Sequence, residues 1–247
     1  MRKLLLVIAL CAMALPTFSQ EEASYDLCFK WGINAVVGHA TYTVTPVKRN
    51  GADALHLDCK GRTAPFFDKF YKIRERFQSW VRPSDCRPME YRRDTDENGY
   101  LADNHYIYDW NAKVINANVK FGDNPRQDIK LPLSEGVYDI TSVIQYVRSI
   151  DFTSFVPGEK RYIKVAIDDE VYDIRLKYVR AENFRVRKMG ELPAFRMSFT
   201  LVAGELFDEG KELSLWLSAD DKRIPLAIMV PLKVGTVWAW YSGYTNG

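Results

Sequence analysis

The most regular feature of this chain is the alternation of apolar and polar residues that begins near Ser24. Runs that start at Tyr25, Leu55, Tyr172 and Phe195 place an apolar side chain at every second position. A period of two is typical of strands that bury one face, so these runs predict β-strands on a common core. A further run has the same period and comprises Leu213, Leu215 and Leu217.

Turn-forming pairs separate the runs. These pairs are Asn50-Gly51, Asn98-Gly99, Asp168-Asp169, Gly204-Glu205, Glu209-Gly210 and Asp220-Asp221. Asn, Asp and Gly suit tight turns because they tolerate positive φ or bond to nearby backbone N–H groups. We therefore predict an all-β fold, an antiparallel sheet that is part barrel and part sandwich, with roughly twelve to fourteen strands.

Two segments depart from this alternation. The stretch Asp139–Ser149 predicts a short amphipathic helix, which Asp139 caps and which lies on the sheet to close one end of the core. Its apolar residues have helical spacing and are Ile140, Val143, Ile144 and Val147. The aromatic-rich stretch Phe66–Tyr71 predicts one helical turn that acts as a plug or lid on the sheet.

The beginning of the chain has the pattern of an export signal. Arg2 and Lys3 precede an apolar run that continues to Leu15, and the small residues Thr17 and Ser19 stand at the expected cleavage site. We predict a secretory signal peptide over residues 1–19 and a single β-rich domain over residues 20–247, located in the periplasm. Lipid attachment at Cys11 is disfavoured because the large Leu10 precedes it, and no later run is long enough for a transmembrane helix.

Charge and composition narrow the class of partner. The chain has 34 Lys and Arg against 32 Asp and Glu, and 47% of its residues are apolar. Removal of the leader takes away two cations, which leaves the mature domain neutral. We therefore expect a globular protein that does not bind nucleic acid through its net charge.

Motifs that would indicate catalysis or a metal are missing from the sequence. It contains no G-x-S-x-G, G-x-x-x-x-G-K-[ST], G-x-G-x-x-G or H-E-x-x-H segment. The histidines are isolated from one another, at His39, His56 and His105. The cysteines beyond the leader lack metal-ligand spacing and allow at most one disulfide among Cys28, Cys59 and Cys86. We predict no cofactor, no metal and no enzymatic activity.

Two groups of aromatic and basic residues are candidates for ligand binding. Tyr71 and Arg74 would grip an acidic or sugar ligand at the mouth of a cavity, or else lie on a strand whose basic residues face water. Trp238 and Trp240 share one strand face, where they would line a groove or close the core.

Several short sequence segments resemble one exported family, the domain of unknown function 3108. In order, they are Tyr25…Trp31-Gly32, Val37-Gly38, Phe70-Tyr71-Lys72-Ile73-Arg74, Tyr138-Asp139-Ile140-Thr141-Ser142, the segment Leu215–Pro225 and Val234-Gly235. The resemblance spans nearly the whole chain beyond the leader. It implies a partly barrel-like fold called YmcC-like, in Gram-negative envelope proteins, and it supplies no catalytic residue.

The positions that match these segments are Gly38, Tyr71, Arg74, Asp139, Ser142, Trp216, Asp221, Arg223 and Pro225. Structural duties account for most of them, such as close backbone approach at Gly38 and a turn at Asp221. Arg74 and Arg223 are expected to pair with Asp139 or Asp221. Together with the aromatic groups, the matches give the candidate binding residues Tyr71, Arg74, Trp216, Arg223, Trp238 and Trp240.

These observations favour a non-enzymatic periplasmic protein that binds an apolar, lipid or glycan ligand of the cell envelope. A first alternative is a scaffold that binds a protein partner in envelope or surface-polysaccharide assembly. A second is a carbohydrate-active enzyme, in which two distant acids such as Glu90 and Asp109 would converge.

Overall fold

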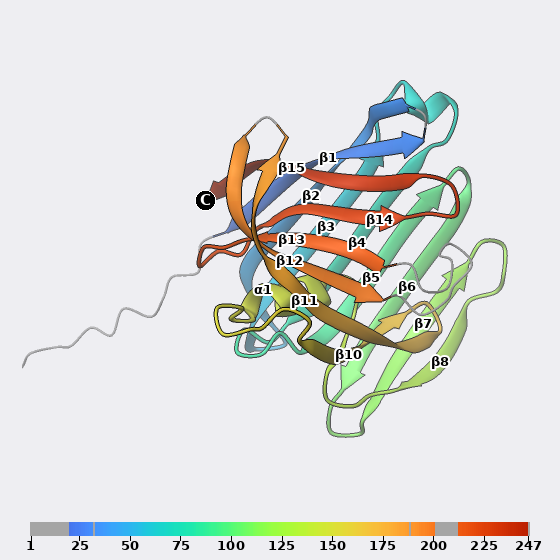
Figure 1. Cartoon of the computed structure of the whole chain (residues 1–247). Helices are drawn as coiled ribbons and strands as arrows, with labels where there is room; N and C mark the ends of the chain where they lie inside the picture. The colour runs from blue at the N-terminus through green and yellow to red at the C-terminus, as the bar shows by residue number, and fades with distance from the viewer. Residues whose placement is uncertain (1–19, 32, 188, 201–211, 247) are drawn as a thin grey trace, which may run out of the picture.

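The computed structural model describes residues 20–31, 33–187, 189–200 and 212–246 (Figure 1). Strands make up most of these residues, and α1 (Ser142–Ser149) and the 3₁₀ turn η1 (Phe67–Lys69) interrupt them. The prediction of an all-β fold with one short helix is confirmed. The proposed leader, residues 1–19, and the pairs Gly204-Glu205 and Glu209-Gly210 lie outside the described residues.

The strands occur at intervals along the whole described chain. Those that precede the helix are β1 (Glu21–Trp31), β2 (Ile33–Arg49), β3 (Ala52–Thr63), β4 (Ile73–Val81), β5 (Pro88–Glu97), β6 (Tyr100–Asp109), β7 (Val114–Phe121), β8 (Gln127–Pro132) and β9 (Val137–Tyr138). Those that follow it are β10 (Lys160–Ile167), β11 (Glu170–Val186), β12 (Gly190–Thr200), β13 (Glu212–Ser218), β14 (Pro225–Pro231) and β15 (Thr236–Asn246).

All fifteen of these strands belong to one sheet, whose order is β8-β7-β6-β5-β4-β3-β2-β1-β15-β14-β13-β12-β11-β10-β9. Every neighbouring pair is antiparallel except β9 and β10. The first and last strands are neighbours, and their register joins Glu21 to Asn246. The count is one above the predicted range, and it refers to the described residues alone.

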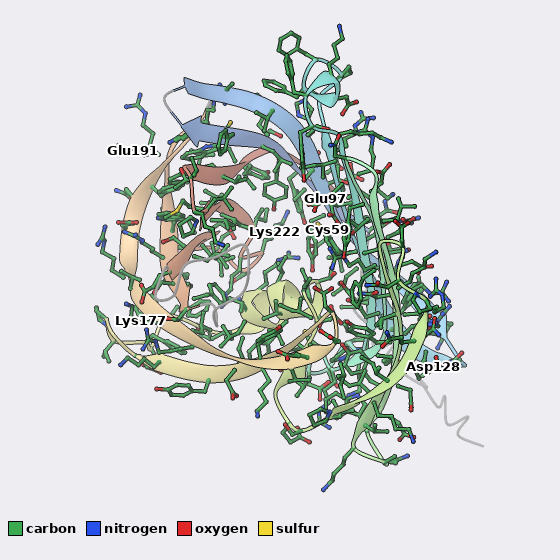
Figure 2. All side chains as sticks on the ribbon, turned by 90° about the vertical axis from the view of Figure 1, so that its right-hand side faces the viewer. Cys59, Glu97, Asp128, Lys177, Glu191 and Lys222 are labelled. Atoms are coloured by element: carbon green, nitrogen blue, oxygen red, sulfur yellow. The ribbon has the colours of Figure 1, made fainter. Side chains whose placement is uncertain are left out.

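The sheet curls into a flattened, incomplete barrel with α1 inside it. Figure 2 shows β3–β8 as a fairly flat wall, while β10–β15 curve round opposite it and enclose the helix. Three apolar clusters occupy the interior: one between α1 and β10–β13, one over β5–β8 and one over β1–β4. Fully buried members include Met197, Tyr106 and Leu57. The alternation read from the sequence therefore identifies the inward face.

The turn between β10 and β11 ties the curved strands to the flat wall. Arg93 Nη1 on β5 donates to Asp168 Oδ1 over 2.5 Å, and Asn104 Nδ2 on β6 donates to the same oxygen over 3.3 Å. The Tyr106 hydroxyl donates to the backbone carbonyl of Asp168. Ala166, just before this turn, packs into the apolar cluster of β5–β8. These contacts close the barrel where no strand pairing does.

A fourth apolar cluster lies on the outer face of the sheet. The end of the long β11–β12 hairpin folds across β13–β15, as Figure 1 shows, and packs Phe184 against Trp216 and Trp240. A register shift between Tyr178 and Arg180 exchanges the two faces of β11, so Tyr178 points inward whereas Phe184 points outward. The shift therefore lets one strand contribute to both layers.

The aromatic segment between β3 and β4 differs from its prediction. It does form a helical turn, η1, but it does not cover the sheet. The side chains of Phe66, Phe70 and Tyr71 are 63%, 71% and 50% exposed. The turn projects beyond the ends of β3 and β4, and no described element packs over it.

No helix among the described residues is long and apolar enough to cross a membrane.

The predicted close approach at Gly38 is present between β2 and β3. A Cβ atom at this position would lie 2.3 Å from the Arg62 carbonyl oxygen, which is too near for any side chain. Gly61, on the adjacent strand, has room for one, since its nearest neighbour is Glu75 Cβ at 3.8 Å. Only one of these two strand glycines is therefore required by sterics.

We expect the substitution Gly38→Ala to lower the free energy of unfolding by about 1–3 kcal/mol because the backbone must move to accept the methyl group. The matched change Gly61→Ala should leave stability within about 1 kcal/mol of the wild type. Urea titrations of the three proteins measure both effects. Equal stabilities of the two variants would contradict the steric argument.

Candidate functional site

The interior of the barrel contains an apolar pocket between α1 and the curved strands. Its volume is about 210 Å³. The residues that line it all have apolar side chains and are Ile140, Val143, Ile144, Val165, Ile167, Ile174, Phe199, Leu213, Leu215 and Ile228. Val143 and Ile144 are only partly buried: Val143 packs against the cluster between α1 and β10–β13, and Ile144 packs against the cluster of β1–β4. Three residues of the predicted apolar stripe, Ile140, Val143 and Ile144, therefore border the pocket, whereas Val147 packs in the core.

A buried carboxyl group fixes the helix in this position. Asp139 Oδ1 accepts hydrogen bonds from the backbone N–H groups of Thr141 and Ser142, at 2.9 and 2.8 Å. The same oxygen accepts a hydrogen bond from Ser79 Oγ on β4. Asp139 thus caps the first turn, as predicted, although the helix begins later than Asp139, at Ser142. It also links the helix to the flat wall.

The environment of Asp139 favours its neutral form. The side chain is fully buried, and burial raises the pKa of this carboxyl to about 6 against the opposing effect of the hydrogen bonds from Ser79 and Ser142. Its second oxygen, Oδ2, is buried without a hydrogen-bond partner in the described chain. A proton on the carboxyl group is consistent with both observations.

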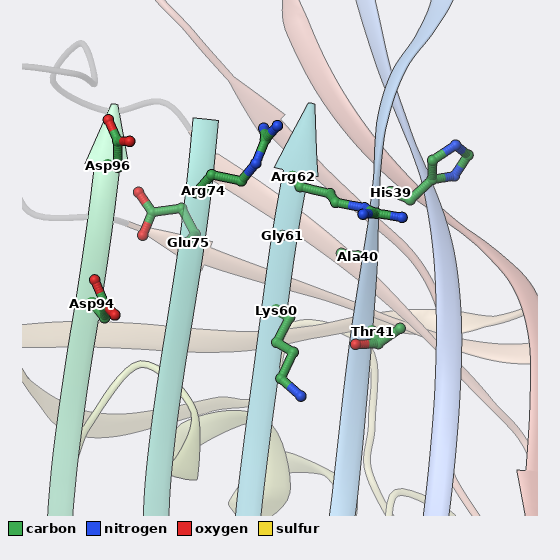
Figure 3. Close-up of a pocket in the computed structure, with 10 residues that line it drawn as sticks. All are labelled: His39, Ala40, Thr41, Lys60, Gly61, Arg62, Arg74, Glu75, Asp94 and Asp96. Carbon is green, nitrogen blue, oxygen red and sulfur yellow. The ribbon is translucent and has the colours of Figure 1, made fainter. Parts of the chain in front are cut away.

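A second hollow lies on the outer face, over β2–β5, and it is charged (Figure 3). Its volume is about 460 Å³, and its walls include the charged and polar side chains of His39, Lys60, Arg62, Arg74, Asp94 and Asp96. Figure 3 shows the Arg62 side chain extending toward β2 and His39. The basic side chains lie on β3 and β4 and the aspartates on β5 (Figure 3), so the hollow offers no uniform charge to a ligand.

The structure separates Tyr71 from Arg74, the pair predicted to share a cavity mouth. Arg74 lines the charged hollow, while Tyr71 belongs to the projecting turn. Both terminal nitrogens of Arg74 donate to the Asp68 carboxylate, at 2.9 and 2.6 Å. Hydrogen bonds from Arg74 and Thr63 lower the pKa of Asp68 to about 2. The expected pairing of Arg74 with Asp139 or Asp221 is wrong, because Asp68 is adjacent to Arg74 whereas Asp139 is buried inside the barrel.

The three predicted tryptophans do come together, under the folded-over hairpin. Trp238 and Trp240 stack at 4.7 Å between ring centroids, and Trp216 stacks on Trp238 at 5.6 Å. Trp216 is 5% exposed, and its Nε1 donates to Glu182 Oε1 over 2.7 Å. Lys30 Nζ lies 4.4 Å from the ring of Trp238. The indole faces therefore contact one another and a cation, and none of them lines the apolar pocket.

Arg223 lies in the β13–β14 turn, away from both hollows. Its nearest charged partner is Asp151, at 3.6 Å, so the expected pairing with Asp139 or Asp221 is wrong here too. The turn is held by Asp220 rather than Asp221, since Asp220 Oδ1 accepts from the backbone N–H of Arg223 over 3.1 Å. Pro225 stands at the start of β14, as predicted.

The acids considered for glycoside chemistry have separate structural partners. Glu90 is buried; burial favours its neutral form, but hydrogen bonds from Arg49 and His105 outweigh this and lower its pKa. Asp109 Oδ1 accepts from the backbone N–H groups of Asn111 and Ala112 in a turn. Both carboxyl groups are thus engaged in holding the fold.

The three described cysteines are unpaired thiols. Cys28 and Cys86 are buried, and burial raises the pKa of Cys59 to about 12 and that of Cys86 to about 11. Thiols with such pKa values are poor nucleophiles at neutral pH. Among the described residues, no three His, Cys, Asp or Glu side chains cluster in a way that would hold a metal ion.

Sequence reasoning found the helical wall of the pocket and missed the strand wall. Ile174, Phe199 and Leu215 were visible as members of alternating runs, which identifies an inward face. Alternation does not distinguish a residue that packs against a neighbour from one that faces a hollow. The sequence feature that could have indicated these pocket residues is the short predicted helix, because a short helix leaves part of a large sheet uncovered.

The fold and the pocket define a barrel-like β protein with an apolar interior site. A match of the family model "Protein of unknown function (DUF3108)" over residues 23–239 shows that the chain belongs to this family, as the resemblance implied. A solved structure, the "Beta-barrel-like Protein of Domain of Unknown Function DUF1849 from Brucella abortus", superposes with a TM-score of 0.62 at 9% identity. That match covers 93% of this chain and 98% of the other, and it bears on the fold alone. No curated protein matches the chain.

We expect the substitution Asp139→Asn to remove a pH dependence of stability. The folded-state pKa of about 6 lies above the ordinary 3.8, so the stabilising contribution is complete below about pH 4 and is lost as pH rises through 6. The free energy of unfolding of the wild type, relative to that of the variant, should fall by about 2 kcal/mol between pH 4 and pH 7.

Urea titrations of both proteins at several pH values test this prediction. The comparison with the variant cancels the opposite contribution of carboxylates whose pKa is lowered, such as Asp68 and Glu90. A stability difference that stays constant across this pH range would mean that folding does not raise the pKa of Asp139.

Proposed function

We propose that this protein is an exported, non-enzymatic binding protein that holds the apolar part of a lipid in its interior. The observation that carries the proposal is the pocket between α1 and β10–β14, whose lining side chains are all apolar. The leader pattern over residues 1–19 supports export, and in a Gram-negative cell this leads to the periplasm.

The chemistry of the pocket favours an acyl chain over a glycan. A sugar taken from water needs hydrogen-bond partners, and without them its burial costs free energy. Ile174, Phe199 and Leu215 offer no such partners, whereas a hydrocarbon loses nothing by leaving water. An apolar cavity of about 150 Å³ in another protein stays free of water and takes up small apolar molecules. The pocket here is larger, at about 210 Å³.

The experiment compares two valine substitutions. Val143 lines the pocket from α1, so Val143→Phe fills part of it with an aromatic ring. Val156 is 65% exposed and outside the pocket, so Val156→Phe is the matched control. The ligand is a fatty acid that carries a polarity-sensitive fluorophore, titrated into each protein purified from residue 20 onward.

We expect saturable binding to the wild type and to Val156→Phe, and a loss of about tenfold or more in affinity for Val143→Phe. Far-ultraviolet circular dichroism and thermal unfolding confirm that each variant is folded. Native mass spectrometry of the wild type, followed by lipid extraction, identifies a ligand carried through purification. The proposal fails if the wild type binds no acyl probe, or if both folded variants bind it as well as the wild type does.

A further inference from the structure

The connection between β3 and β4 exposes aromatic side chains to solvent at one end of the barrel. Phe66 and Phe70 are more than half exposed, and their rings contact each other at 5.6 Å between centroids. Tyr71 is 50% exposed beside them, and Tyr100 and Leu101 at the neighbouring β5–β6 turn are 46% and 54% exposed. We call Phe66–Tyr71 the aromatic turn. Exposed apolar side chains gathered in this way mark a contact surface.

The aromatic turn is held rigidly, so the exposure of its rings is built into the fold. The backbone N–H of Tyr71 donates to the Phe67 carbonyl over 2.9 Å. Asp68 points back toward the stem, where it accepts hydrogen bonds from Thr63 and Arg74. The acidic residue of the turn is thereby directed toward the protein. The aromatic residues on either side of it are directed outward.

The charges near the aromatic turn leave cations unpaired. Asp68 is paired with Arg74, and Asp96 is paired with Lys72 at 2.6 Å. Lys69 and Arg62 are exposed and have no acidic partner in the described part of the chain, while Glu97 is the remaining acid of the adjacent turn. Aromatic rings interspersed with lysine and arginine suit the headgroup region of a bilayer that contains anionic lipids.

The position of the aromatic turn relates it to the interior pocket. Every neighbouring pair from β8 through β1 and β15 to β10 is antiparallel, so the strand direction alternates along the sheet. As a result, β3, β10 and β12 end at the same rim of the barrel. Ile167 and Phe199, at or next to the ends of β10 and β12, line the pocket. Figures 1 and 2 show the cyan aromatic turn at the upper edge of the molecule, beyond the strand ends. The helix Ser142–Ser149 lies toward the opposite rim, where Arg148 donates to Glu21 and to the Lys222 carbonyl.

We propose that the aromatic turn inserts its side chains into the surface of a phospholipid bilayer with anionic headgroups. The rim of the barrel nearest the pocket then faces the membrane. A projecting, convex turn suits a deformable lipid surface better than a rigid protein partner, which would need a matching cavity. The purpose of this contact, lipid transfer into the pocket, rests on the proposed function, whereas the contact itself does not.

Vesicle co-sedimentation tests the contact in the absence of any added ligand. The protein purified from residue 20 onward is mixed with vesicles of phosphatidylethanolamine and phosphatidylglycerol, or with vesicles of phosphatidylcholine alone. The double variant Phe66→Ser/Phe70→Ser removes both rings, and Lys69→Glu reverses one charge. Tyr162→Ser is the control, because Tyr162 is 74% exposed on β10 but distant from the rim.

We expect the wild type and Tyr162→Ser to bind the anionic vesicles more tightly than the phosphatidylcholine vesicles. The double variant should lose about tenfold or more in vesicle affinity, because two rings no longer leave water. Lys69→Glu should lose affinity for the anionic vesicles alone, and added salt should have the same effect on the wild type.

The pocket variant separates this proposal from the proposed function. Val143→Phe should bind vesicles as the wild type does, and the double variant should still bind the fluorescent fatty acid in solution. The proposal is overturned if the wild type does not sediment with anionic vesicles, or if the double variant sediments equally well. It is also overturned if the aromatic turn instead mediates self-association, seen as a dimer of the wild type that the double variant lacks in analytical ultracentrifugation.

Discussion

The interior of this protein depends on the turn between β10 and β11 reaching across to the flat wall. The sheet ends in β8 on one side and in the two-residue β9 on the other, and these edges do not pair with each other. Asp168 supplies the missing connection through Arg93, Asn104 and Tyr106. Arg93 is largely buried on the inner face, where an unpaired cation would be costly, so the ion pair is needed as soon as the barrel closes.

The pocket follows from the same geometry. Fifteen described strands enclose more space than a helix of eight residues fills. Asp139 holds the start of that helix against β4, on the flat wall, while Val147 packs among the side chains of β10–β13. A hollow remains between the start of the helix and β10–β14. The buried carboxyl group, the short helix and the apolar site are thus parts of one arrangement.

Much of the fold could be predicted from the sequence, and less of the site. The period-two runs, the Asn50-Gly51 turn and the cap at Asp139 are local signals, and the structure confirms them. Which distant strands face one another is not local, and neither the pocket nor the partner of Arg74 could be inferred. The aromatic turn was misplaced for the same reason, since apolar residues predict burial only where another element covers them.

The pairing of β1 with β15 determines when the chain can complete its fold during synthesis. Strands β1–β8 are consecutive neighbours and can form hairpin by hairpin as they emerge. The second partner of β1, strand β15, is among the last residues made, and residues that pack against the clusters of Leu57 and Tyr106 also come late. The half-made protein therefore carries an uncovered apolar sheet with a free edge, a form prone to aggregation that a chaperone would need to shield.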